Sequence, residues 1–385
     1  MSVEIKKSQA MDVFERFRQT FDNRHDYARE WKKRTGGRVV GYLCTYVPEE
    51  ILYAANILPV RIFGGHEPQD ITEPHIWNMF CAYSRDCLAQ GLLGRYSYLD
   101  GIVAANGCQH IRQTHDSWQR HIPISFSYFF YMTTHVQSRA AHACLPDEVR
   151  DFRTAVEEWT GKAISDDALN RAIEVFNTNR RLMKDLYELR KSDPPMLSGL
   201  EALEMVAASM VMEKEDHNRL LEQAKAELKK RSQREAGKVR VMMVGSEMDD
   251  LNLMHILEAA GASVVVDDSC VGTRYFWNQA EMNSDPILSI SERYLNKPPC
   301  PVYDITGVRR RKEHILTLAH EYNVQTCVLI LQKFCEPHEM SIPAVQSWLK
   351  ERDISTLVLE TDITISAGQV GTRIEAHLEM LDQGE

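Results

Sequence analysis

The fold of this chain is decided by the stretch Val39-Val40-Gly41-Tyr42-Leu43-Cys44-Thr45-Tyr46-Val47-Pro48-Glu49-Glu50. Here an apolar run ends at a cysteine, a proline follows, and two glutamates open a helical pattern. This order predicts a buried strand that carries Cys44 at its C-terminal end, followed by the N-terminus of a helix. In open α/β sheets, ligands bind at this edge.

The same arrangement of an apolar strand ending at a cysteine recurs three times further along the chain. The predicted strands are Leu99–Cys108, Ala262–Cys270 and Thr326–Cys335. Because parallel strands share one sheet edge at their carboxyl ends, we expect Cys44, Cys108, Cys270 and Cys335 to lie at sheet edges suited to ligand binding.

Helices and strands alternate in two separated regions, which predicts the α/β class with parallel sheets. We expect two Rossmann-like or flavodoxin-like domains, over residues 36–145 and 237–385, joined by a helical segment. The N-terminal residues 1–35 read as a helix, with amphipathic periodicity over residues 9–34. Residues 146–236 show long helical periodicities and no strand signal.

Two further elements of the first region are predicted from periodicity. A helix over about residues 74–95 carries Cys81 and Cys87, and the segment Ile122–Phe126 reads as a strand. The segment His110–His121 between them reads as a helix.

Bulk composition restricts the class of protein. A chain of 385 residues predicts two or three domains. The net charge of −10 argues against binding to a nucleic-acid backbone. No window approaches 18 consecutive apolar residues, and the segment Met1–Lys7 has no apolar signal core. We therefore expect a cytoplasmic protein without a membrane span.

The nine cysteines are unlike a disulfide framework, because nine is odd and the cytosol keeps thiols reduced. Cys81 is expected near a helix start, where the helix dipole lowers a thiol pKa, and Cys300 lies between two prolines. Together with the four cysteines at strand ends, Cys81 and Cys300 form a set of soft sulfur ligands suited to zinc or iron–sulfur chemistry. For any single cysteine, inert packing is the more frequent role, and we expect it for Cys87, Cys144 and Cys327.

Common short motifs are absent. There is no CxxC, so metal ligands must converge through the fold. There is no GxxxxGK[ST] phosphate loop, no GxGxxG after a strand and no GxSxG nucleophile motif.

These residues together resemble the family of 2-hydroxyacyl-CoA dehydratases and benzoyl-CoA reductases over nearly the whole chain. The resemblance is carried by six segments, which are Cys44–Glu50, Phe80–Arg85, Gly107–His110, Asp193–Gly199, Lys333–Cys335 and Glu360–Asp362. At Gln109 this chain departs from the acidic residue or asparagine that is often found there.

The resemblance implies a [4Fe–4S] cluster held by Cys81, Cys108 and Cys335. Some family members hold a double-cubane [8Fe–9S] cluster through six cysteines. The segments around Cys270 and Cys300 resemble the additional cysteine regions of that branch, and Cys44 completes the six. The metal ligand set implied for a larger cluster is therefore Cys44, Cys81, Cys108, Cys270, Cys300 and Cys335.

Within the family, this chain is most similar in length and in its overall sequence pattern to the smaller cluster-bearing catalytic subunit of ATP-dependent benzoyl-CoA reductases. This implies two-electron reduction of the benzoyl-CoA ring to cyclohexa-1,5-diene-1-carbonyl-CoA. The implied partners are a homologous larger catalytic subunit, a two-subunit ATPase activator module, ferredoxin as electron donor and an aromatic acyl-CoA substrate. The missing phosphate loop agrees with ATP hydrolysis in a separate module.

Proton delivery must accompany the electrons, and the candidates nearest to the cysteines in sequence are His110, Glu49 and Thr45, with Tyr46 beside them. Glu49 also has a structural reading, because glutamates favour helix N-termini. The alternatives to the reductase are a subunit of a radical 2-hydroxyacyl-CoA dehydratase, a double-cubane reductase of small molecules and a zinc-stabilised scaffold.

Overall fold

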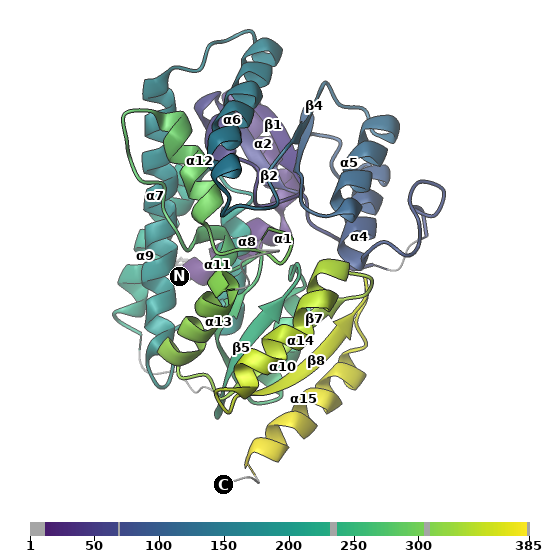
Figure 1. Ribbon diagram of the computed structural model, residues 1–385, viewed down its shortest axis with the longest axis vertical. Coiled ribbons are helices and arrows are strands. Elements are labelled where there is room, and N and C mark those ends of the chain that lie inside the picture. The colour runs from purple at the N-terminus through teal and green to yellow at the C-terminus, as the bar shows by residue number, and fades with distance from the viewer. Residues whose placement is uncertain (1–11, 68–69, 232–236, 304–308, 383–385) are drawn as a thin grey trace, which may run out of the picture.

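The computed structural model describes residues 12–67, 70–231, 237–303 and 309–382. Within these ranges the chain forms two four-stranded parallel sheets, with strand orders β2-β1-β3-β4 and β6-β5-β7-β8 (Figure 1). In each sheet the first strand lies between the second and the third. The prediction of two Rossmann-like or flavodoxin-like parallel sheets is confirmed.

The first sheet follows two N-terminal helices, α1 (Val13–Asp22) and α2 (Arg24–Thr35). Its strands and the helices between them are β1 (Arg38–Tyr42), α3 (Glu49–Ala54), β2 (Ile57–Arg61), α4 (Ala82–Leu92), β3 (Gly101–Ala105), α5 (Gln109–His121) and β4 (Phe126–Phe130). The inner strands β1 and β3 are almost wholly buried, whereas the edge strand β4 is buried only at its ends. Burial on both faces is what a parallel sheet covered by helices requires.

The helical segment consists of α6 (Arg139–Thr160), α7 (Asp166–Glu188), the short 3₁₀ helix η1 (Leu189–Lys191), α8 (Gly199–Ser209) and α9 (Lys214–Leu228). Serine side chains cap three of the N-termini: Ser138 accepts from the Ala141 amide, Ser165 accepts from the Ala168 amide, and Ser198 forms a capping box with Glu201. Helix α7 contacts α3 of the first half and two helices of the second half, α11 (Thr273–Phe276) and α12 (Pro286–Asn296). The segment therefore connects the two sheets rather than forming a separate lobe.

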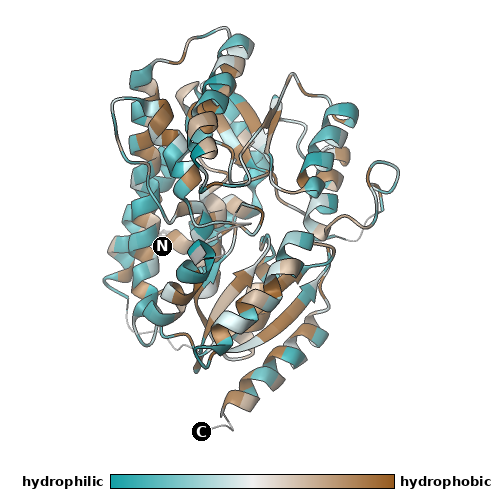
Figure 2. Cartoon of the chain, in the orientation of Figure 1, coloured by the Kyte–Doolittle hydropathy of each residue, from teal (hydrophilic) through white to brown (hydrophobic). Residues whose placement is uncertain are grey.

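The second sheet consists of β5 (Val239–Gly245), β6 (Ala262–Asp268), β7 (Thr326–Gln332) and β8 (Ser355–Thr361). Its further helices are α10 (Leu251–Ala259), α13 (Arg309–Glu321), α14 (Glu336–Lys350) and α15 (Ala367–Asp382). Figure 2 shows the apolar strands of this sheet beneath helices that turn polar residues outward. No helix among the described residues is both long and apolar enough to cross a membrane.

Three predicted elements of the first half differ from the structure. The predicted helix over residues 9–34 is two helices, because the Asn23 side chain donates to the carbonyl oxygen of Gln19 and competes with the helical backbone pattern. Residues 9–11 lie outside the described part of the chain. The predicted helix 74–95 begins only at Ala82, because Cys81 has an extended backbone and the residues before it form turns.

The predicted strand Ile122–Phe126 is displaced towards the C-terminus. The amides of both Ser125 and Phe126 bond to the Asp100 carbonyl oxygen, and the strand pairs with β3 only from Phe126 onward. Pro123 lacks the amide hydrogen that a strand pairing needs, which agrees with this late start.

Candidate metal centre

One pocket lies where the two sheets face each other, and it is lined by six cysteines. These are the cysteines that the sequence analysis grouped: Cys44, Cys81, Cys108, Cys270, Cys300 and Cys335. The other three cysteines, Cys87, Cys144 and Cys327, do not line it. The fold therefore brings together thiols that come from both halves of the chain.

Sheet topology explains how the strand-end cysteines converge. Cys44 and Cys108 follow β1 and β3, the adjacent strands between which the strand order of the first sheet reverses. Cys335 follows β7, which flanks the equivalent reversal point of the second sheet, and Cys270 follows β6. The carboxyl ends of strands at such a reversal form the usual binding crevice of open α/β sheets. Here two crevices share one pocket.

Three of the six cysteines have the same local geometry. Cys81, Cys108 and Cys335 are the N-cap residues of α4, α5 and α14. The unpaired backbone amides at a helix N-terminus give it partial positive charge, which stabilises a thiolate or any other anion. Three helix N-termini therefore contribute favourable charge to one pocket, and these three residues are the ones that the resemblance implies as cluster ligands.

Burial and amide charge oppose each other at these thiols. Burial raises the pKa of Cys81 and Cys335, and it raises that of Cys108 to about 12. Neighbouring thiols raise the pKa of Cys108 and Cys335 further, whereas backbone amides in the first turn of each helix lower all three values. Without a bound cation the thiols are protonated at neutral pH, so metal binding would release protons.

The remaining three cysteines lie in loops. Cys44 follows β1, Cys270 follows β6, and Cys300 lies in the proline-flanked turn after α12. Burial raises the pKa of Cys44 and Cys270, and the Cys300 thiol acts in the same direction on both. Cys300 also raises the pKa of Cys108 and Cys335. Its thiol therefore interacts electrostatically with members of both groups of three cysteines.

The pocket wall leaves room and an unused donor for a bound group. A Cβ atom on Gly107 would lie 3.8 Å from Cys44 Sγ and 3.7 Å from the Tyr303 hydroxyl, so the missing side chain keeps the space beside both groups open. The buried Tyr303 hydroxyl has no hydrogen-bond partner among the described residues. A sulfur-rich anionic group would supply the acceptor that this hydroxyl lacks.

Buried cations balance the charge around the pocket. Glu247 lines the pocket, and its Oε1 accepts from Arg61 Nη2 at 2.5 Å. Burial raises the pKa of Glu247, although Arg61 opposes the rise. Arg274 is buried beside Cys270, and its charge opposes the burial-induced rise in the thiol pKa.

The three predicted proton-transfer residues do not line the cysteine pocket. His110 follows Cys108 by two positions; its Nδ1 accepts from the Cys81 backbone amide at 3.2 Å, and its ring stacks on Phe80. Burial lowers the pKa of His110, which favours the neutral ring that can accept this bond. His110 thus links the backbone segments of two predicted ligands.

Glu49 and Thr45 instead anchor the segment after Cys44 to the rest of the chain. The carboxylate of Glu49 accepts from the Tyr275 hydroxyl at 3.1 Å and lies 3.6 Å from the Lys214 ammonium group. Thr45 accepts from Lys297 through both its carbonyl oxygen and its hydroxyl. Both residues are almost fully buried.

Sequence reasoning missed Ser246, Glu247, Tyr303, Gln332 and His338, which all line the pocket. Ser246 and Glu247 directly follow β5, so the rule that selected the strand-end cysteines could have selected them too. No comparable signal pointed to Tyr303 or His338, since each reaches the pocket through a turn or a helix start.

No group of three or more His, Cys, Asp or Glu side chains within the described ranges is arranged to hold a single metal ion. A polynuclear cluster makes a different demand, because each thiolate binds a different iron atom and the sulfurs need not meet at one point. The donor set of six thiols, with no carboxylate or imidazole required, is typical of iron–sulfur clusters.

Comparison with known proteins identifies the family. The model of the family described as 2-hydroxyglutaryl-CoA dehydratase, D-component, matches residues 44–381, which begin at Cys44 and include all six pocket cysteines. The chain belongs to this family. The resemblance inferred from the sequence motifs is therefore confirmed.

Relatives within the family include both a reductase and dehydratases. One component of the benzoyl-CoA reductase of Thauera aromatica is 26% identical over 334 residues, covering 85% of this chain and 86% of the relative. The (R)-phenyllactyl-CoA dehydratase beta subunit of Clostridium sporogenes is 24% identical over 372 residues, covering 96% and 98%. The beta subunit of (R)-2-hydroxyglutaryl-CoA dehydratase from Acidaminococcus fermentans is 25% identical, covering 91% and 94%. Each relative is named as one subunit of an enzyme.

Proposed function

We propose that this chain is the iron–sulfur catalytic subunit of a benzoyl-CoA reductase-type enzyme, which reduces the aromatic ring of an acyl-CoA thioester by two electrons. The observation that carries the proposal is the convergence of six thiols from both sheets on one pocket. The similarity to the benzoyl-CoA reductase component of Thauera aromatica supports the reductase type.

Cys81, Cys108 and Cys335 would hold a [4Fe–4S] cluster, with their helix N-termini stabilising its negative charge. Together with Cys44, Cys270 and Cys300 they would hold a double-cubane [8Fe–9S] cluster. Such a cluster supplies low-potential electrons that no amino-acid side chain can provide.

A second pocket of about 450 Å³ adjoins the cysteine pocket and suits an aromatic acyl group. The two pockets share Cys108, Val302 and Pro337. Helix α14 contributes apolar side chains to the second pocket, among them Met340 and Trp348. A ring held there would lie next to a predicted ligand, which is the positioning that electron transfer to a ring needs.

Two protons must reach the ring with the two electrons to give a cyclic dienoyl-CoA. His110, two residues after Cys108, would relay a proton, and its bond to the Cys81 amide supports this role. Glu49 and Thr45 remain proposed participants, and their bonds to Tyr275 and Lys297 keep the Cys44 segment in place. The proposed partners are a homologous larger catalytic subunit, a two-subunit ATPase activator module and ferredoxin.

Anaerobic analysis of iron and acid-labile sulfide tests the cofactor. Several irons and sulfides per chain, with little zinc, are expected. A protein that contains zinc and no sulfide would overturn the iron–sulfur proposal and favour the zinc-stabilised scaffold.

Electron stoichiometry tests the reaction type. With benzoyl-CoA, ATP, the activator module and a strong reductant, two electrons should be consumed for each product molecule. A radical dehydratase recycles its electron, so turnover of a 2-hydroxyacyl-CoA with only catalytic amounts of reductant would contradict the reductase proposal.

A second candidate is a homodimeric double-cubane reductase of small molecules, which is favoured by the presence of all six cysteines in one chain. Affinity purification of the tagged chain under anaerobic conditions separates the two. A distinct homologous subunit in stoichiometric amount supports the acyl-CoA reductase, and recovery of the tagged chain alone supports the small-molecule reductase.

A further inference from the structure

Arg274 is a buried arginine in α11, four positions after Cys270, and it is 1% exposed. Its Nη2 donates to the carbonyl oxygen of Gly245, the last residue of β5, at 2.5 Å. Its Nε and Nη1 have no hydrogen-bond partner within the described ranges. Burying a charged group is unfavourable unless it is paired, so the remaining donors of Arg274 need a nearby anion.

The carboxylate of Asp268 offsets only part of this charge. Its Oδ1 lies 3.7 Å from Arg274 Nε, and its Oδ2 lies 3.2 Å from Arg311 Nη2. Although burial opposes the shift, Arg311 and Arg274 lower the pKa of Asp268, which keeps this carboxylate ionised. One buried carboxylate is therefore shared by two guanidinium groups. The nearby carboxylate of Glu247 is already paired with Arg61, so these five side chains carry one more positive than negative charge.

The thiols of the adjoining loop cysteines are the acidic groups that this charge favours as anions. Burial raises the pKa of Cys270, and Arg274 is the largest opposing influence. Burial likewise raises the pKa of Cys44, against the charges of Arg61 and Lys297. In the thiolate form that binds metal, both sulfurs would face buried positive charge from side chains.

The other three pocket cysteines have a different electrostatic environment. Cys81, Cys108 and Cys335 lie at helix N-termini, which supply only partial charges. Arg85 opposes the burial-induced rise in the pKa of Cys81, but its Nη2 is paired with Asp362 Oδ1 at 2.7 Å and its side chain is 15% exposed. The pocket therefore has one side with full charges from buried arginines and another side with helix N-termini.

The loop that carries Cys270 and Arg274 is held in one conformation by hydrogen bonds. Asp267 Oδ1 accepts from the Thr273 amide at 3.0 Å, and the Thr273 hydroxyl donates to the Asp267 carbonyl oxygen at 2.7 Å. Gly272 lies so close to this carboxylate that a Cβ atom would be 1.6 Å from Oδ1. A charge fixed in this way stabilises a developing negative charge without having to rearrange first.

We propose that Arg274 is a positioning residue that stabilises negative charge on the iron–sulfur group at the Cys44, Cys270 and Cys300 side of the pocket. Arg274 does not line the pocket, so it acts through its charge on Cys270 and on the group bound there rather than by touching substrate. The inference rests on the proposed function and deepens it, because it names a residue that controls how readily the group accepts electrons from the reductant.

The charge of Arg274 should act on the reduction potential. Each electron that the group receives adds one negative charge. A fixed positive charge nearby lowers the energy of the reduced form more than that of the oxidised form. Arg274 therefore raises the reduction potential of the group.

Anaerobic redox titration of the full-length protein, followed by EPR spectroscopy, tests this role without turnover. Arg274→Gln should make reduction about tenfold less favourable, which shifts the midpoint by about 59 mV to more negative potential for one electron. Asp268→Asn removes the opposing charge and should shift the midpoint in the positive direction. Opposite shifts from two neighbouring replacements are what a charge effect produces, whereas loss of packing would have no such sign.

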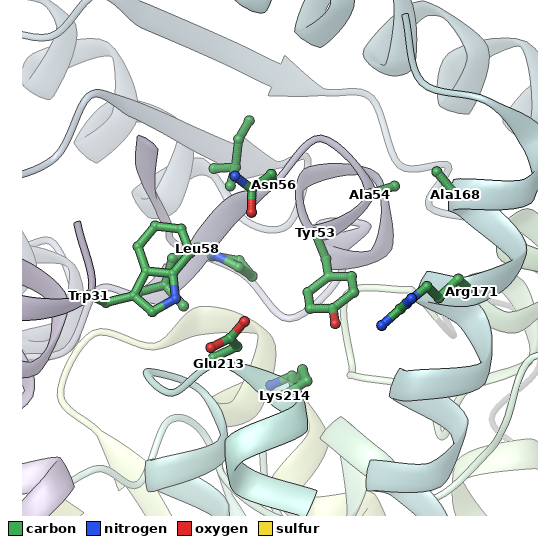
Figure 3. Close-up of a pocket in the computed structure, with 11 residues that line it drawn as sticks. Trp31, Tyr53, Ala54, Asn56, Leu58, Ala168, Arg171, Glu213 and Lys214 are labelled. Atoms are coloured by element: carbon green, nitrogen blue, oxygen red, sulfur yellow. The ribbon is translucent and has the colours of Figure 1, made fainter. Parts of the chain in front are cut away.

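Two controls separate this effect from burial and from net charge. Arg240→Gln replaces another buried arginine of the same sheet, whose donors bond to the carbonyl oxygens of Tyr322 and Arg190 at the opposite end of β5. Arg171→Gln removes the same charge from an exposed residue of α7. Figure 3 shows Arg171 beside a pocket that shares no lining residue with the cysteine pocket. Both variants should retain the wild-type midpoint.

A wild-type midpoint in Arg274→Gln overturns the inference, and so does an equal shift in Arg240→Gln. If Arg274→Gln binds no iron, Asp268→Asn decides, and a midpoint that stays unchanged or becomes more negative overturns the inference. Protein that contains no iron and sulfide overturns the proposed function together with this inference. Protein with the expected shifts but no reduction of benzoyl-CoA contradicts only the reductase proposal.

Discussion

Lys297 donates hydrogen bonds to the carbonyl oxygen and the hydroxyl of Thr45, at 2.9 and 3.1 Å. The two residues belong to different halves of the chain, and each lies within three positions of a pocket cysteine, Thr45 beside Cys44 and Lys297 before Cys300. One buried ammonium group thus fixes the relative position of two cysteine segments.

This lysine should make the stability of the iron-free protein depend on pH. Burial, and then the charge of Arg293, lower the pKa of Lys297 to about 7. The unfolded chain, in which lysine has its usual higher pKa, therefore binds more protons above pH 7, and stability rises with pH there by up to about 1.4 kcal/mol per pH unit. Below pH 7 the lysine is charged in both states and the dependence disappears.

The measurement is urea unfolding of the wild type and of Lys297→Met between pH 6 and 8. The difference in the free energy of unfolding between the two proteins should move in favour of the wild type as pH rises. A difference that is constant across this range would contradict the lowered pKa. Lys33→Gln serves as the control, because its side chain is exposed.

Single replacements of the cysteines should divide them into ligands and non-ligands. Cys335→Ser removes a thiol at a helix N-terminus in the pocket, so anaerobic iron content should fall strongly. Cys327→Ser is the matched control. Cys327 lies at the start of β7, the strand that leads to Cys335, is fully buried and does not line the pocket. Its iron content should equal that of the wild type.

Cys270→Ser and Cys300→Ser distinguish the two cluster types. If six thiols hold a double cubane, each replacement should lower iron content without abolishing it, because the three thiols at helix N-termini remain. Wild-type iron content in both variants would show that Cys270 and Cys300 are not ligands and that the six-cysteine set is wrong.

Removing one partner of a buried ion pair near the pocket should destabilise the protein strongly. Arg180 Nη2 bonds to Glu50 Oε1, and both side chains are at most 5% exposed. Arg180→Met leaves a buried carboxylate without its cation and should cost about 3–5 kcal/mol in the free energy of unfolding. Replacing both residues by apolar ones should cost less than the sum of the single changes. Additive losses in denaturant unfolding would contradict this coupling.

A second charged contact between the halves should make the stability of the protein depend on pH in both the acidic and the basic range. His66 Nε2 lies 3.2 Å from Asp249 Oδ1, and Nδ1 of the same ring bonds to the Ile363 carbonyl oxygen. Although burial opposes each shift, the pair raises the pKa of His66 to about 10 and lowers that of Asp249 to about 2. The raised histidine pKa contributes stability that is complete below about pH 6.5 and is lost as pH rises through 10. The lowered aspartate pKa contributes stability that is lost as pH falls from about 4 towards 2.

The variant His66→Gln should therefore be less stable than the wild type by about 1–3 kcal/mol near pH 6, the usual cost of leaving a buried charged group without its partner. The deficit should shrink above pH 10. NMR titration of the His66 ring provides the direct check, and a midpoint near the ordinary histidine value would refute the ion pair.

Much of this architecture could be predicted because the strands that lead to the cysteines, β1, β3, β6 and β7, are short, apolar and nearly wholly buried. The strand ends at Cys44, Cys108, Cys270 and Cys335 lie within three residues of the observed strands, and the apolar runs alone predict them. The predicted helix ends were less accurate than the predicted strand ends. The predicted start of α4 lies several residues before Cys81, which is the N-cap of this helix. Cysteine is not a usual cap, so no capping signal marked this boundary.

The rest of the pocket depends on contacts between segments that are distant in sequence. Tyr303 and Glu247 line it because loops of the second half face the first sheet there, and Arg61 reaches Glu247 across 186 positions of chain. Such pairings have no local sequence signature. The roles of Glu49 and Thr45 were suggested by their nearness to Cys44, whereas their observed bonds hold this segment against the second half.

The distribution of the pocket thiols over both halves has a consequence for biosynthesis. Cys44 and Cys108 can reach their sheet edge as soon as the first half has folded, but β7 and Cys335 are synthesised much later. A nascent chain thus presents these two thiols on an open crevice before the opposing wall exists. Metal loading that requires the closed pocket can only follow synthesis and folding of the second half.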